Sequence, residues 1–153
     1  MVALLIQIIF SYLSAVSFGV ITNVPRRALW ACGFTGMIGW MIFYFINNSR
    51  HGLGVANFLA AFVIGVLSIF FSRRLKMPMI IFIIPGIVPL VPGGAAYQAV
   101  RNLFLNQHRY AFENIMIVIV TAGAIAGAFM MTSMIETIIK QRNQKRTNSK
   151  QQK

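Results

Sequence analysis

The chain has 153 residues, of which 58% are hydrophobic and only 10% are charged, and its mean hydropathy is +0.72. An average soluble domain has about 25% charged residues, so this composition excludes a soluble globular protein and indicates an integral membrane protein. The 14 basic residues outnumber the two acidic ones and give a net charge of +12. They lie in short connectors and at the carboxyl end, which argues for membrane orientation and against nucleic-acid binding.

Five apolar stretches are long enough to cross a bilayer, which needs about 20 residues of helix. We therefore predict an all-α polytopic membrane protein with five transmembrane helices. The first stretch lacks a basic start and a small-residue cleavage site, so we expect a retained span and not a signal peptide. The predicted spans cover residues 1–21, 28–46, 55–71, 79–106 and 113–139.

The last 14 residues, 140–153, have a different composition from the rest of the chain. They contain six basic residues, no acidic residue and no apolar residue. Such a segment cannot bury a core, so we predict a membrane domain over 1–139 and a disordered, basic cytoplasmic tail over 140–153. The tail could bind anionic membrane lipid or simply enforce orientation.

Small residues recur in two of the predicted spans. Glycines let neighbouring membrane helices approach closely, which is how such helices pack without a hydrophobic driving force. We predict helix packing at Gly33, Gly36 and Gly39 in the second span, and at Gly123 and Gly127, a GxxxG pair, in the fifth span.

The fourth stretch, 79–106, starts as a membrane span but carries prolines and glycines in its middle. Each proline removes a backbone donor and obstructs the preceding turn, so one straight helix cannot run through all of them. Irregular backbone at membrane depth is tolerated only where protein covers it or water reaches it. We therefore predict that this helix is broken and that the break lies on a substrate path. The residues predicted to break it are Pro85, Gly86, Pro89 and Pro92.

The broken stretch could cross the membrane or turn back on itself. If it crosses, the connectors 22–27 and 72–78 and the carboxyl end share one side, which then holds 11 basic residues against three. If it turns back, the count is seven against seven. The positive-inside rule favours five crossings of the cell membrane, with the amino terminus outside and the carboxyl terminus in the cytoplasm.

Beyond the break, a second half-helix would begin at Gly93 and Gly94. Its first backbone N–H groups, at Gly93, Gly94, Ala95 and Ala96, could bind the carboxylate of a substrate, as helix amino termini bind anions. The same glycines could equally form only a structural kink.

Three polar side chains on the same half-helix are candidates for contact with the substrate or for a gate. Tyr97 and Gln98 lie within reach of the first turns and are predicted substrate contacts, although Tyr97 could instead anchor at the membrane interface. Arg101 lies eight residues past Gly93, roughly 12 Å along a regular helix. We therefore assign Arg101 to a gate or an interface and not to the same carboxylate.

The run from Pro85 to Tyr97, PGIVPLVPGGAAY, with Asn23-Val24-Pro25 before the second span, resembles the small subunit, or carboxy-terminal half-domain, of the threonine/serine exporter (ThrE-type) family. The core of the resemblance is Pro-x-x-Pro-Gly-x-x-x-Tyr. The resemblance implies a secondary exporter of threonine or serine that works with a larger five-span partner. Related two-component members are associated with dicarboxylate export, succinate being an example, so the substrate stays open.

The absence of certain residues narrows the function further. The sequence has no aspartate, and its two glutamates, Glu113 and Glu136, fall toward the ends of the fifth span. No general base, metal site or cofactor site can be identified, so we do not expect an enzyme. If export is proton-coupled, as the resemblance implies, the partner should supply the coupling carboxylate. A scaffold or assembly subunit that does not transport is the remaining alternative.

Overall fold

The computed structural model describes residues 2–49 and 52–151, with the side chains of α6 described as far as 139 and at 141. All elements in these residues are helical, and no strand occurs among them. The elements are α1 (Val2–Ile21), α2 (Arg26–Asn48), α3 (Leu53–Leu75), α4 (Ile80–Ile87), the 3-10 turn η1 (Val88–Leu90), α5 (Gly93–Phe104) and α6 (His108–Gln151).

Four of these helices are long and apolar enough to cross a membrane: α1, α2, α3 and the part of α6 up to Ile139. The segments Ile80–Leu90 and Gly93–Phe104 pass the same test as a pair, and the chain bends by 53° between them. The described chain thus has four spans, or five if the bent pair is one span. The prediction of an all-α polytopic membrane protein is confirmed.

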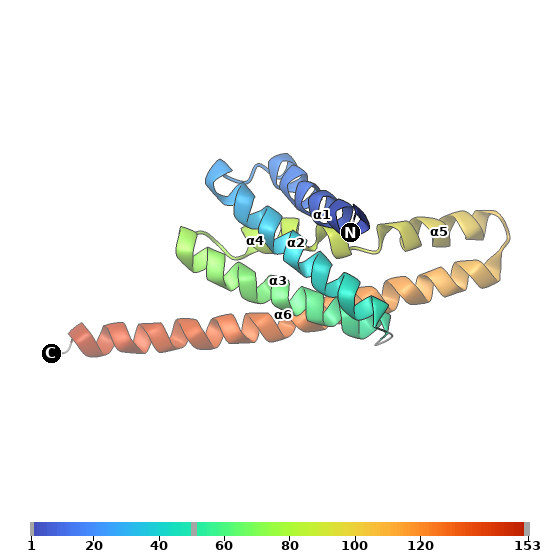
Figure 1. The fold of residues 1–153 in the computed structure, drawn as a ribbon. Helices are drawn as coiled ribbons and strands as arrows, with labels where there is room; N and C mark the ends of the chain where they lie inside the picture. The colour runs from blue at the N-terminus through green and yellow to red at the C-terminus, as the bar shows by residue number, and fades with distance from the viewer. Residues whose placement is uncertain (1, 50–51, 152–153) are drawn as a thin grey trace.

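The helices form a bundle in which two turns lie at the same end (Figure 1). The α1–α2 turn and the α3–α4 turn lie there, and the carboxyl end of α6 extends past them. We call this the basic end, because Arg26, Arg27, Arg73, Arg74 and Lys76 are all exposed in or beside these two turns. The start of α1, the end of α2 and the start of α3 lie toward the opposite end (Figure 1).

Helix α2 contacts three neighbours through its three glycines. Gly33 faces Tyr12 of α1, and Gly39 faces Ile64 of α3. A Cβ atom on Gly36 would lie 2.6 Å from the Cβ of Ala15 in α1 and 3.3 Å from a backbone oxygen of α4. Because a three-residue spacing drifts around a helix with 3.6 residues per turn, the glycines face different helices. They allow close approach on three sides of α2.

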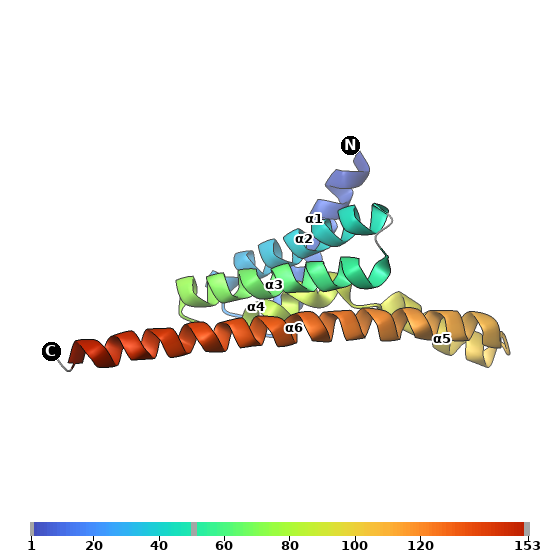
Figure 2. The same cartoon turned by 90° about the horizontal axis from the view of Figure 1, so that it is seen from below.

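Helices α3 and α6 lie side by side and run in the same direction (Figure 2). A Cβ on Gly54 would lie 3.3 Å from Val120, and one on Gly65 would lie 2.5 Å from Thr132. The contacting residue numbers rise together along the two helices, so α3 and α6 are parallel. The first turns of α6, before Val120, therefore extend beyond the start of α3.

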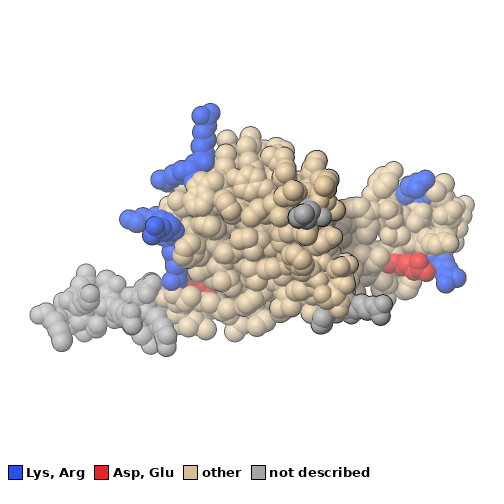
Figure 3. All heavy atoms as spheres, viewed as in Figure 1, with Lys and Arg blue, Asp and Glu red and all other residues tan. Residues whose placement is uncertain are grey.

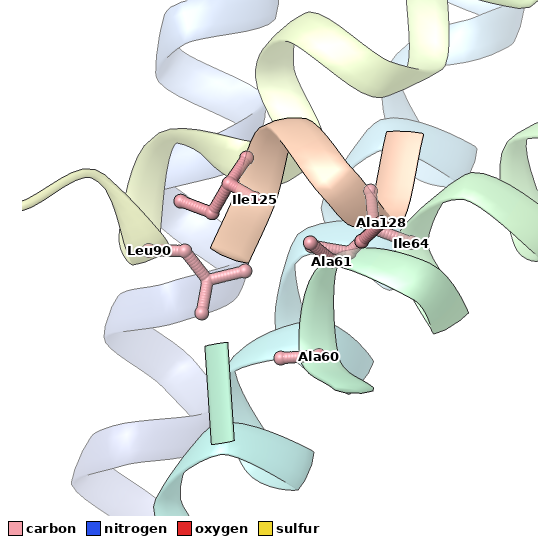
Figure 4. Packing of buried hydrophobic residues seen from close by; sticks show 6 residues of the cluster. All are labelled: Ala60, Ala61, Ile64, Leu90, Ile125 and Ala128. Atoms are coloured by element: carbon pink, nitrogen blue, oxygen red, sulfur yellow. The ribbon is translucent and has the colours of Figure 1, made fainter. Parts of the chain in front are cut away.

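One hydrophobic cluster joins α3, η1 and α6. Leu90 and Ile125 supply its larger side chains, while alanines keep the helices close together (Figure 4). Its buried members are Ala60, Ala61, Ile64, Leu90, Ile125 and Ala128. A second cluster, nearer the basic end, joins the start of α2 to the α3–α4 turn and to Phe82 of α4. The two clusters hold α4 and η1 inside the bundle.

The backbone of α6 continues as helix through Gln151, so it includes most of the segment 140–153 that the sequence predicts to be a disordered tail. Figure 1 shows this part of α6 extending away from the bundle. The division of the chain at residue 139 stays a prediction.

Candidate functional site

The interruption of the fourth span lies at Val91 and Pro92. Helix α4 runs through Pro85 and Gly86 and gives way to η1 at Val88. Val91 then has an extended backbone, and Pro92 is the N-cap of α5. Of the four residues predicted to break the helix, Pro89 lies in η1 and Pro92 at the break, whereas Pro85 and Gly86 lie inside α4.

Gly86 is a close-packing position in the middle of the bundle. A Cβ added there would lie 3.0 Å from Thr35 of α2 and 3.2 Å from Ile64 of α3. Ile64 is the midpoint of α3, and Leu90 belongs to the same buried cluster as Ile64. The break, which follows Leu90, therefore lies near the middle of the bundle.

The first turn of α5 has backbone donors without acceptors inside the helix. The N–H of Gly93 donates to the Val91 carbonyl at 2.8 Å, and that of Ala96 donates to the Pro92 carbonyl at 3.0 Å. The N–H groups of Gly94 and Ala95 belong to the set that no helix can satisfy internally, and no side chain caps this end. The positive end of the α5 dipole is therefore available to an anion.

This end of α5 also faces open space. Gly93 and Gly94 are exposed, and a Cβ atom on either would meet no atom within 4 Å. Backbone amides in such a position can be reached by a ligand or by another protein chain. The structure thus brings Gly93, Gly94, Ala95 and Ala96 together as one half-helix start.

The side chains predicted to follow these amides are all exposed. Tyr97 is 69% exposed, and Gln98 and Arg101 are exposed as well. Arg101 lies in the last turns of α5, eight residues from Gly93 and roughly 12 Å along the helix. Tyr97 and Gln98 are therefore close to the open amides along the chain, and Arg101 is not.

The predicted glycine pair of α6 lies in different surroundings from the glycines of α2. A Cβ atom on Gly123 would meet no atom within 4 Å, and one on Gly127 would make ordinary contact with Phe58 at 3.7 Å. Within the described residues, Gly123 therefore lies at an open surface.

Helix α5 and the start of α6 form a hairpin that extends beyond the rest of the bundle (Figure 1). Because Gly54, near the start of α3, lies beside Val120, the 12 residues 108–119 extend about 18 Å past it. Large apolar side chains are exposed there, including Phe104 at 84% and Phe112 at 61%. The sequence pattern predicts one span over 79–106 and does not indicate this hairpin.

A cavity at the basic end is a second feature that the sequence pattern does not predict. Its volume is about 560 Å³, and it lies between the α3–α4 turn, the start of α4 and α6. The i, i+3 spacing of Ser133 and Glu136 was the available signal, since such residues share a helix face. Three separate segments line the cavity: Ser72, Met77, Pro78, Met79, Ile80, Ile83, Phe129, Ser133 and Glu136.

Charged side chains gather at the two ends of the molecule. Figure 3 shows Lys and Arg side chains at the basic end and a smaller group, beside an acidic one, at the α5–α6 hairpin. In the hairpin, Arg109 pairs with Glu113 at 3.4 Å, and both are largely exposed. Among the described residues, no three metal-ligating side chains come together.

These features define a polytopic all-α membrane protein with a discontinuous span. Residues 7–135 match the model of the family described as Threonine/Serine exporter, ThrE, so the chain belongs to that family. The family predicted from the Pro/Gly run is thereby confirmed.

Comparison with individual proteins adds one point about length. The chain is similar to an uncharacterized protein of Haemophilus influenzae, with 26% identity over 135 residues. The alignment covers 88% of this chain but only 45% of that protein, so the chain spans about half the length of the curated relative. No solved structure matches the chain.

Proposed function

We propose that this chain is one half of a secondary exporter of threonine or serine, and that a larger five-span membrane partner supplies the other half. Membership in the exporter family supports the transport function. The length of the curated relative, of which this chain covers 45%, supports a machine that is about twice as large. Two five-span halves can pack as an inverted pair, an arrangement common among secondary transporters.

The substrate path in this proposal passes the first turn of α5. The observation that carries it is the pair of N–H groups at Gly94 and Ala95, which lack intrahelical acceptors beside an open surface. Unsatisfied backbone groups at membrane depth cost several kcal/mol each, so a ligand or a second chain must satisfy them. A carboxylate is well suited to both the donors and the dipole.

The partner is also expected to supply the proton-coupling group. The whole sequence has two acidic residues, and neither lies near the break: Glu113 pairs with Arg109 in the hairpin, and Glu136 lies at the basic end. A carboxylate near the middle of the membrane would therefore have to come from another chain. This chain alone should not transport.

In the proposed orientation of the protein in the membrane, the basic end faces the cytoplasm and the amino terminus lies outside. Five exposed basic residues lie in or beside the two turns at the basic end, and the carboxyl end of α6 extends past them. The positive-inside rule assigns such an end to the cytoplasm.

The test compares two open glycines. Neither Gly94 nor Gly123 has an atom within 4 Å of an added Cβ, so a side chain can begin at both without a clash at its Cβ. In cells that also express the partner, Gly94→Val should lower threonine efflux roughly tenfold or more, the loss expected when one hydrogen bond to a charged group is blocked. Gly123→Val should export like the unmodified chain.

Three results would contradict the proposal. Gly94→Val that assembles and exports normally would favour a scaffold role. Robust threonine efflux by this chain without its partner would show that it is not half of a machine. Efflux of succinate in place of threonine and serine, measured in parallel, would replace the substrate class.

A further inference from the structure

The cavity at the basic end has an apolar body with a few polar groups. Methionine, isoleucine, proline and phenylalanine side chains form most of its wall. The polar lining consists of Ser72 from the end of α3, together with Ser133 and Glu136 from α6. A largely apolar cavity with a few converging polar groups is the usual form of a small-molecule site.

The hydroxyl groups of this cavity have already used their hydrogens. Ser72 donates to the carbonyl of Met77, and Ser133 donates to the carbonyl of Met130 at 2.8 Å. A serine hydroxyl has one hydrogen and two lone pairs, so both oxygens can still accept. An ionised glutamate accepts only, with about four lone-pair sites, so Glu136 can accept a further donor beside its existing interaction. With their hydrogens directed at these carbonyls, the polar side chains of the cavity present mainly acceptors to a ligand.

We propose that this cavity binds the ammonium group of a small amino acid, with Glu136 as its charged acceptor and the serine oxygens as neutral ones. An ammonium group has three donors and no acceptor, which complements the lining. A carboxylate placed beside Glu136 would be repelled by its charge. Naming the ligand as the exported amino acid rests on the proposed function, whereas the preference for an ammonium group rests on the cavity alone.

The rim of the cavity has the opposite charge. Arg73, Arg74 and Lys76 lie in the chain between Ser72 and Met77, which both line the cavity, and all three are exposed. A zwitterion whose ammonium group reaches Glu136 can leave its carboxylate near these cations. The cavity and its rim together match an amino acid better than they match an amine or a dicarboxylate.

The cavity and the break are separate sites along the bundle. Ser133 lies eight residues after Ile125 on α6, about 12 Å along the helix, and Ile125 packs with Leu90 just before the break. The buried cluster that contains Leu90 and Ile125 fills the space near the break. A small amino acid would therefore occupy the two sites in succession. The cavity is the site nearer the basic end.

The test measures binding without transport, in membranes that hold the full chain and its partner. Ile80 lines the cavity and is 56% exposed, so Ile80→Cys gives a thiol that a maleimide can label. The native Cys32 is fully buried and should contribute little labelling. Threonine and threonine methyl ester, which both carry an ammonium group, should slow the labelling. Succinate should not.

The charged acceptor is tested in the same Ile80→Cys background. Glu136→Gln should raise the threonine concentration needed for half-protection roughly tenfold or more, because a hydrogen bond between two charged groups is lost. For Glu136→Asp, which keeps the charge, the threonine concentration needed for half-protection should lie between the values for Glu136 and for Glu136→Gln. Glu113→Gln is the matched control: Glu113 lies in the hairpin at the far end of the molecule, and its loss should leave protection unchanged.

Several outcomes would overturn the inference: no protection by threonine, equal protection by succinate, or full protection in Glu136→Gln. If Glu136→Gln does not fold, the ranking of the three ligands on the Ile80→Cys chain still decides. The labelling test can also be distinguished from the efflux test of the proposed function. Protection without any threonine efflux contradicts the proposed function and supports the site, whereas efflux without protection contradicts the site alone.

Discussion

The contact between Gly36 and Ala15 provides a quantitative test of the packing around α2. A Cβ atom on Gly36 would lie 2.6 Å from the Cβ of Ala15, well inside the distance that real Cβ atoms tolerate. Both residues are buried. The Cβ of Ala15 is fixed to its own backbone and cannot rotate away, so Gly36→Ala must push α1 and α2 apart or leave a strained contact.

The expected magnitude follows from two opposing terms. Overpacking a buried contact costs about 1–3 kcal/mol. Replacing a helical glycine with alanine gains up to about 1 kcal/mol in helix propensity. Gly123→Ala receives the same gain without a clash, because nothing lies within 4 Å of its added Cβ. The difference in unfolding free energy between the two variants is therefore expected to be about 1–3 kcal/mol, with Gly36→Ala the less stable.

The assay is reversible unfolding of the purified chain in detergent, followed by circular dichroism, for the four members of a double-mutant cycle. Ala15→Gly removes the methyl group that Gly36→Ala meets, so the double variant should recover about 1–3 kcal/mol relative to additivity. Effects that add to within about 0.5 kcal/mol would refute the close approach of α1 and α2 at this point.

Two further predictions concern orientation and a polar contact. Ser49→Cys should react with an impermeant maleimide on intact cells, and Arg74→Cys only after permeabilisation, because these exposed residues lie at opposite ends of the bundle; the reverse pattern would invert the proposed topology. Gln7→Leu should lower the unfolding free energy by about 1 kcal/mol, since the indole N–H of Trp40 donates to Gln7 at 2.7 Å. In a Trp40→Phe background the loss should be much smaller, and equal losses would show that this hydrogen bond contributes nothing.

The sequence predicted the straight spans well, because about 20 apolar residues between polar turns have few alternatives in a membrane. The predicted second span, 28–46, became Arg26–Asn48, and the third, 55–71, became Leu53–Leu75. Most of the added residues are arginine, asparagine or serine, which extend a helix past the apolar core without appearing in a hydropathy pattern.

The fourth span was harder to predict, because proline has different consequences in different surroundings. Pro85 and Gly86 stay in α4, where Thr35 and Ile64 pack against the glycine. Pro92 ends the irregular stretch. At the two glycines that follow, an added Cβ atom would meet no other atom within 4 Å. The sequence showed that the helix must be interrupted somewhere between residues 85 and 92. Only the neighbouring helices determine where.

The i, i+3 spacing of Ser133 and Glu136 indicates one wall of the cavity at most, because the rest of the wall comes from two other segments that no local pattern connects to it. Ser72 and Ser133 are 61 positions apart in the sequence, and each is an ordinary helix residue whose hydroxyl bonds to a nearby carbonyl. They line the same cavity only because α3 and α6 pack in parallel, which brings the two helices together at the basic end.

The two candidate sites are chemically complementary. The start of α5 offers donors at Gly94 and Ala95, and the cavity offers acceptors at Glu136 and the serines. A dicarboxylate can satisfy the donors but is repelled at the cavity, and a simple amine has the opposite preference. An amino acid carries both groups, and it can reorient between the two sites, which are more than about 12 Å apart along the bundle, so each site can bind it by a different end. This arrangement favours a zwitterionic substrate over a dicarboxylate, because only a zwitterion has an attractive contact at both positions along one path.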